Sequence, residues 1–227
     1  MKVTKEFIRP DSGKPASVAL GLFDGIHIGH TKVLAPCVFT YTISSFVPQI
    51  KKNYLALMPD EQKCAILERM GFEQVVMPDF SSFKDMEPEE FVEKMLIQGM
   101  GAKELSCGYD FTFGKGGAGT TETLCRVAER HGVKVNVVEP VTLDGEPVSS
   151  TRIRQAILEG KMDEASRMLG RRFCLRLKVE QLHWAAAGFP DHQPVLPAAP
   201  HRPALRRLFH GRQCSRQAVR RRDKRRG

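Results

Sequence analysis

The stretch SVALGLFDGIHIGH (residues 17–30) decides how the chain is interpreted. Its first four residues are small and apolar and include the β-branched Val18, as expected of a buried strand. An Asp-Gly turn follows, and then His27 and His30 with a glycine between them. The segment that begins at Thr31 has helical periodicity. The sequence therefore predicts that the two histidines lie where a strand passes into a helix.

Short β-like runs alternate with amphipathic segments over the rest of residues 1–173, which predicts an α/β fold with a parallel sheet and helices on both sides. Strands are expected over 37–42, 73–78, 104–107 and 134–140, helices over about 59–71, 88–98 and 121–131, and two short helices over 152–169. Ligands of such sheets bind beyond the carboxyl ends of the strands. The histidine motif is at such a position.

The connection after His30 is short. About six residues separate His30 from the expected strand at 37–42, whereas a crossover between parallel strands usually needs about ten or more. Either the crossover is abbreviated, or a segment of roughly ten residues is missing from it.

Composition excludes several classes of protein. No apolar run reaches the roughly 18 residues of a membrane-spanning helix, and the N-terminus has no apolar signal segment. The six cysteines are scattered without CxxC spacing, which argues against a zinc site or a disulfide framework and for a reducing cytoplasm. We therefore expect a cytoplasmic protein without membrane partners or a bound metal site of its own.

The net charge of +9 is located at the C-terminal end. Residues 182–227 hold eleven of the 35 Lys and Arg and two of the 26 Asp and Glu, so the remaining chain is balanced. Five prolines lie between residues 190 and 203, and apolar periodicity is lost. We expect this tail to be disordered. Its RRRDKRR run (220–226) attracts phosphates without specificity, and no recognition module accompanies it, so no specific nucleic-acid partner is expected.

The first motif has the chemistry of a phosphate site. Gly21, Gly25 and Gly29 let the backbone turn tightly and approach a ligand. A helix N-terminus beyond them would offer unpaired N–H groups, and His27 and His30 could donate to phosphate oxygens. The alternative is that both are ordinary structural histidines.

Two further stretches suggest a nucleotide site. CGYDFTFGKGGAGT (107–120) combines glycines with aromatic residues that suit a flat heterocycle, although its spacing is wrong for a P-loop; a mobile loop with its aromatics in the core is the alternative. VSSTRIR (148–154) places a Ser-Ser-Thr run before a helix, with Arg152 and Arg154 at the same helix start, where a polyphosphate could be held. A helix cap alone also explains the Ser-Ser-Thr run.

Together and in this order, the three stretches resemble the bacterial bifunctional riboflavin kinase/FMN adenylyltransferase, or FAD synthetase, family over roughly residues 16–173. GLFDGIHIGH is similar to the HxGH motif of nucleotidyltransferases, SSTRIR to their S-S-T-x-x-R motif, and GYDFTFGKGG to the flavin-family loop. The resemblance implies a Rossmann-like domain that transfers AMP from Mg²⁺-ATP to FMN, giving FAD and pyrophosphate.

The resemblance also implies roles for individual residues. The catalytic residues would be His27, His30 and Arg154, and the flavin would contact Gly108, Asp110, Phe111 and Phe113. ATP and its phosphates would contact Gly21, Phe23, Asp24, Gly25, Gly29, Ser150, Thr151 and Arg152.

The family's second domain, a β-barrel that phosphorylates riboflavin, should follow residue 173. Residues 174–181 are a believable start to it, but the pattern is then lost. Back-translation of 184–194 and 203–208 in a frame moved by one base permits GRRLGFPTIN and PRFGVY, which resemble kinase-domain segments. We therefore expect a truncated or frame-shifted kinase half without riboflavin kinase activity. The alternative is a remnant that at most binds ATP or flavin.

Overall fold

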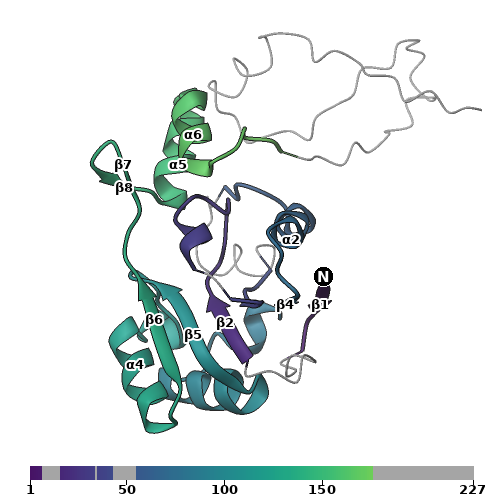
Figure 1. The fold of residues 1–227 in the computed structure, drawn as a ribbon, viewed down its shortest axis with the longest axis vertical. Helices are drawn as coiled ribbons and strands as arrows, with labels where there is room; N and C mark the ends of the chain where they lie inside the picture. The colour runs from purple at the N-terminus through teal and green to yellow at the C-terminus, as the bar shows by residue number, and fades with distance from the viewer. Residues whose placement is uncertain (7–15, 34, 43–54, 176–227) are drawn as a thin grey trace, which may run out of the picture.

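The computed structural model describes residues 1–6, 16–33, 35–42 and 55–175 (Figure 1). Six parallel strands form one sheet in the order β1-β4-β3-β2-β5-β6. Its strands are β1 (Lys2–Thr4), β2 (Ala16–Leu20), β3 (Cys37–Phe39), β4 (Gln74–Val76), β5 (Ala102–Gly108) and β6 (Lys134–Val138). The predicted Rossmann-like α/β fold is confirmed; the short edge strand β1 was not anticipated.

The helices begin and end close to the places that the sequence predicts. The α-helices are α2 (Asp60–Arg69), α3 (Pro88–Glu90), α4 (Thr121–Arg130), α5 (Ser150–Leu158) and α6 (Met162–Leu169). Short 3-10 turns are η1 (His30–Lys32), η2 (Phe80–Ser82) and η4 (Lys115–Gly117), and a small hairpin is formed by β7 (Thr142–Leu143) and β8 (Glu146–Pro147). Side-chain caps open α4 at Thr120 and α5 at Ser149, and Gly170 ends α6 in the left-handed region at φ 67°.

The segment expected as a helix over 88–98 is helical, but most of it is a π-helix, η3 (Phe91–Gly99). Consistent with the wider turn, the N–H of Met100 donates to the carbonyl of Met95, five residues earlier, at 3.0 Å. The amphipathic face that the sequence indicates is kept, since Phe91, Val92 and Leu96 are buried.

Successive residues of β2 pack against opposite faces of the sheet. Val18 and Leu20 contact the core formed with η3 and α4, whereas Ala19 contacts the core formed with α2. A third core lies between α5, α6 and Leu57. Figure 1 shows α5, α6 and the β7–β8 hairpin together at one end of the molecule, beyond the sheet.

The helix predicted after His30 is wrong, because among the described residues of this segment (30–33 and 35–36) only the three-residue turn η1 is helical. The crossover is short, as the sequence indicates, and both alternatives, an abbreviated connection and a missing segment, stay open. Val18 pairs with Cys37, so the connection must return along β2 in a few residues. A helix advances about 1.5 Å per residue against about 3.3 Å for an extended chain, and the connection has no length to spare for several helical turns.

The expectations for residues 182–227, and for nearly all of 174–181, lie outside the described residues. Within the described part, no helix has both the length and the hydropathy needed to cross a bilayer.

Candidate active site

A cavity of about 300 Å³ lies where the carboxyl ends of β2 and β5 meet the start of α5. All three motifs line it, although the first and the third are more than 100 residues apart in the chain. The sequence-predicted residues on its wall are Gly21, Phe23, Asp24, His27, Gly29, His30, Gly108, Asp110, Phe111, Ser150 and Thr151. The structure therefore brings together eleven of the fifteen residues singled out from the sequence.

The two histidines form a stacked pair. Their ring centroids are 3.8 Å apart, with 19° between the ring planes. The backbone N–H of His27 donates to Nδ1 of His30 at 3.3 Å. A neutral His30 therefore carries its proton on Nε2 and can donate from that atom. A Cβ on Gly29 would lie 3.0 Å from the His27 ring, so a larger residue at this position would displace the ring by a few tenths of an ångström.

Both imidazoles are held neutral. Burial, and then the charge of Arg171, lower the pKa of His27 to about 4. Burial also lowers the pKa of His30 well below its usual value, helped by His27, Lys63 and Arg171. At neutral pH each ring thus offers an uncharged N–H donor rather than a full positive charge.

The backbone that carries the histidines is strained. Phe23 and Ile26, which are not glycines, have φ values of 53° and 41°, and Gly25 between them has a φ of 88°. Such conformations persist only where the surrounding contacts hold them, and they cluster at functional sites.

Asp24 links three separate segments. It is 1 % exposed, and its carboxylate accepts from Arg154 Nη2 at 2.6 Å and from the backbone N–H of Leu57 at 2.9 Å. Its carbonyl accepts from the Ser150 hydroxyl at 2.7 Å. Asp24 therefore fixes the first motif to the start of α5.

Arg154 takes part in this link and is absent from the cavity wall. Its Nε donates to the carbonyl of Leu55 at 2.8 Å, and its guanidinium is bound to Asp24. In this arrangement the guanidinium of Arg154 is directed to Asp24 and Leu55. Gly25 is also off the wall; its Cα faces Leu57, whose Cδ1 would lie 2.7 Å from an added Cβ.

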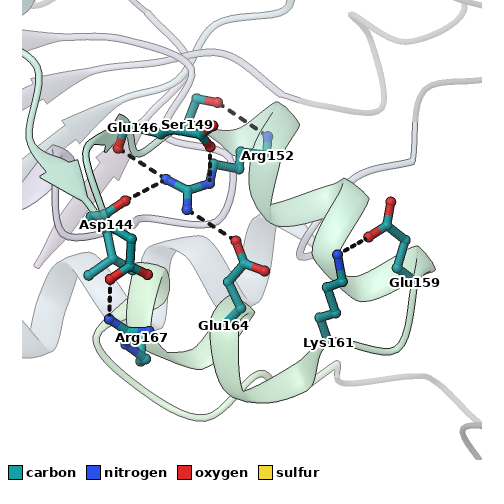
Figure 2. Close-up of polar contacts among 9 residues, drawn as sticks. Asp144, Glu146, Ser149, Arg152, Glu159, Lys161, Glu164 and Arg167 are labelled. Atoms are coloured by element: carbon teal, nitrogen blue, oxygen red, sulfur yellow. Dashed lines mark hydrogen bonds and ion pairs between the residues drawn. The ribbon is translucent and has the colours of Figure 1, made fainter.

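Arg152 is placed elsewhere than expected. Its guanidinium donates to the carbonyls of Leu143 and Glu146, both at 3.0 Å, and to the carboxylate of Glu164 at 3.1 Å (Figure 2). Arg152 thus ties the β7–β8 hairpin to α5 and α6. Ser149 caps α5 by accepting from the Arg152 N–H at 3.2 Å, as the helix-cap interpretation predicted.

The second motif divides between cavity and core. Asp110 and Phe111 line the cavity, whereas Phe113 is buried with its ring 5.6 Å from that of Phe91. Phe113 and Gly119 exchange backbone hydrogen bonds, which close the loop on itself. One of the expected flavin residues is therefore a core residue, as the alternative for this loop had it.

Lys63 is a site residue that the sequence did not reveal. It is 0 % exposed, and its Nζ donates to the carbonyls of Leu22 at 3.3 Å and Tyr41 at 3.1 Å, both in residues of the cavity wall, and pairs with Asp60 at 3.3 Å. Burial lowers the pKa of Lys63. A lysine in the first turn of a helix normally extends into solvent, so no local pattern distinguishes it.

Comparison with known proteins identifies a family of related sequences. The sequence profile described as FAD synthetase matches residues 9–152. A bifunctional riboflavin kinase/FMN adenylyltransferase from Listeria monocytogenes is 30 % identical over 67 % of this chain and 53 % of the relative. The corresponding protein from Pseudomonas fluorescens is also 30 % identical, over 73 % of this chain and 57 % of the relative. The chain thus spans about half the length of these curated relatives.

A shorter relative is matched over most of its length. A FAD synthetase from Listeria monocytogenes is 29 % identical over 87 % of this chain and 85 % of the relative. A crystal structure titled as a macrolide-efflux protein from Streptococcus pneumoniae superimposes with a TM-score of 0.62 and 32 % identity, over 75 % of this chain and 60 % of that one. The profile match, the relatives and the shared cavity of the three motifs lead to one conclusion: the chain belongs to the FAD synthetase family.

Proposed function

We propose that this protein transfers the adenylyl group of ATP to the phosphate of FMN, giving FAD and pyrophosphate. The observation that supports this most directly is the convergence of the histidine motif, the aromatic loop and the α5 N-terminus on one cavity. The family match supports the same reaction.

The chemistry requires positioning rather than a general base. The FMN phosphate is a monoester that is largely ionised at neutral pH, so it can attack the α-phosphorus of ATP in line without losing a proton. Charge that develops on the transferring group needs donors in place beforehand. We assign this task to His27 and His30, whose stacked, neutral rings meet the cavity.

The leaving pyrophosphate is assigned to the start of α5. Ser150 and Thr151 line the cavity there, and the first N–H groups of a helix have no partners within it. The sequence predicts a phosphate site at a helix after His30, and we place this site at the N-terminus of α5 instead. For Arg154 and Arg152 the observed contacts support positioning roles, through Asp24 and through the β7–β8 hairpin.

The flavin is assigned to the side of the cavity formed by Gly108, Asp110 and Phe111, where Tyr109 adds a second aromatic ring. ATP is proposed to enter as its Mg²⁺ complex. Within the described residues, no cluster of three or more His, Cys, Asp or Glu could hold a metal ion, so the phosphates themselves would supply most ligands. We also propose a cytoplasmic location, because the described cysteines are all free thiols.

The test is to incubate the full chain with Mg²⁺-ATP and either FMN or riboflavin, and to separate the flavins by chromatography. FAD is expected from FMN, and no FMN from riboflavin. His30→Ala should lower kcat by on the order of 10²–10³-fold, with FMN affinity nearly unchanged. His131→Ala is the matched control, because that half-exposed ring pairs with Glu93 on the far helices.

Two results would contradict the proposal. Binding of FMN and ATP without any turnover would identify a catalytically defective remnant. Near-normal turnover of His30→Ala would show that the histidine pair does not have the role assigned to it in the reaction.

A further inference from the structure

The turn that carries His27 contacts the C-terminal end of α6. The N–H of Ile28 donates to the carbonyl of Met168 at 3.0 Å. Gly170 lies against the same residue, since a Cβ added to it would be 3.0 Å from Ile28 Cγ2. These contacts join segments about 140 residues apart and involve a part of the chain beyond the 9–152 match to the family profile.

Arg171 makes the strongest of these contacts. Its Nη1 donates to the carbonyl of Ile26 at 2.7 Å and to that of Leu169 at 3.1 Å, and its Nη2 donates to the carbonyl of Gly25. One guanidinium therefore binds both the strained turn and the last turn of α6. Its planar fork suits several carbonyls at once, which a lysine ammonium serves less well.

The turn needs such a donor. Gly25 and Ile26 both have positive φ and lie between β2 and η1, outside any strand or helix, so their carbonyls are not part of the sheet ladder or of a helix. Buried carbonyls without a donor cost free energy, and a strained backbone persists only when its surroundings fix it. Arg171 satisfies both carbonyls with a charged donor.

Arg171 also acts on the histidines electrostatically. The charged and titratable groups that bear on His27 are Arg171, Asp24 and the stacked His30. The positive charge of Arg171 favours a neutral His27, whereas Asp24 opposes it. Lys63 acts on His30 in the same direction as Arg171.

Resting on the adenylyl transfer proposed above, we propose that Arg171 is a positioning residue of the reaction: its guanidinium holds the backbone of Gly25 and Ile26 so that His27 and His30 stay stacked at the cavity. The catalytic unit then extends to residue 171.

The test uses the full chain with Arg171→Ala, Arg171→Lys and, as matched control, Arg172→Ala, whose side chain is exposed in the neighbouring position. Arg171→Ala should lower kcat for FAD formation by about 10²-fold through misplacement of the histidines, with a smaller change in KM for FMN. Free guanidinium at a non-denaturing concentration should restore part of this activity. Arg172→Ala should behave as wild type.

A second readout does not depend on turnover. In NMR spectra of histidine-labelled protein, the ring protons of His27 and His30 should report their stacking through ring-current shifts. In Arg171→Ala these shifts should collapse, and His27 should titrate closer to the ordinary histidine pKa of about 6.5.

The outcomes separate the two proposals. Unchanged ring shifts and unchanged kcat in Arg171→Ala would overturn the positioning role. If wild type forms no FAD, the proposed function fails, and the ring shifts alone decide on the role of Arg171. If Arg171→Ala does not fold, Arg171→Lys decides: reduced kcat with altered ring shifts supports the proposal, and full activity overturns it.

Discussion

Replacing Asp24 by asparagine tests the contact that links the first motif to α5. Asp24 is 1 % exposed, and the Arg154 side chain that it binds at 2.6 Å is 15 % exposed. Asparagine can still accept from the N–H of Leu57, but its amide group would face the guanidinium, donor against donor. Breaking a buried ion pair from one side costs about 3–5 kcal/mol. Since Arg154 keeps some exposure and its bond to Leu55, we expect the lower value.

The assay is urea unfolding of Asp24→Asn, Arg154→Met and the double variant, followed by circular dichroism. A loss of about 3 kcal/mol corresponds to a fall in Tm of roughly 6–12 °C for a chain of this size. The double variant should lose about 1–3 kcal/mol less than the sum of the single losses, because the two groups interact directly. Arg167→Met is the control; Arg167 pairs with Asp144 at 2.8 Å, but both side chains are more than half exposed.

Additive losses in this cycle, or an Asp24→Asn variant as stable as the Arg167→Met control, would refute the reasoning. Asp24 and Arg154 would then be in contact without a measurable coupling free energy.

Three further perturbations follow from the same site. In the folded protein the pKa of His27 is lowered to about 4, so the unfolded chain binds the proton more tightly. The free energy of unfolding should therefore fall as pH drops from about 6.5 to 4, by up to about 3 kcal/mol for this group. Urea midpoints measured across that pH range check this, and His27→Gln should flatten the pH profile. Lys63→Met removes the ammonium donor from the partly buried carbonyls of Tyr41 and Leu22, of which the second still accepts from the Thr40 hydroxyl at 2.9 Å, and should cost about 1 kcal/mol in urea unfolding; an unchanged midpoint would contradict this. Gly29→Ala brings a Cβ within 3.0 Å of the His27 ring, and should lower kcat by roughly 3–10-fold through ring displacement while leaving Tm unchanged.

Much of the fold follows from local signals. The alternation of apolar runs and amphipathic segments predicts the parallel sheet, and helix signals such as Pro59 and Ser149 predict where helices begin. The strand β1 is missed because three residues of an edge strand carry almost no periodicity. The helix after His30 is the opposite error, because it is predicted but does not form. Its residues have the helical period, but the connection to β3 is too short for a helix.

The site is predicted less completely than the fold. Motif spacing finds the residues that line the cavity with backbone or short side chains, such as Gly29 and Ser150. It does not determine where long side chains go: Arg152 and Arg154 share a motif, yet each is bound by a different distant segment. Lys63 is likewise found only when the carboxyl ends of two strands are placed beside its helix.

The strained histidine turn also bears on the order in which the protein is made. Several of its partners lie far along the chain. Asp24 accepts a hydrogen bond from Arg154, 130 residues later, and the carbonyls of Gly25 and Ile26 accept from Arg171, 146 and 145 residues later. Contacts between such distant residues form late, because the intervening chain must first be ordered. During synthesis the sheet strands up to β6 can therefore pair before the contacts of the turn with Arg154 and Arg171 exist. The contacts of Arg171 with the turn form only after residue 171 has left the ribosome, so a nascent chain stalled before that point carries both histidines in a turn that lacks these contacts.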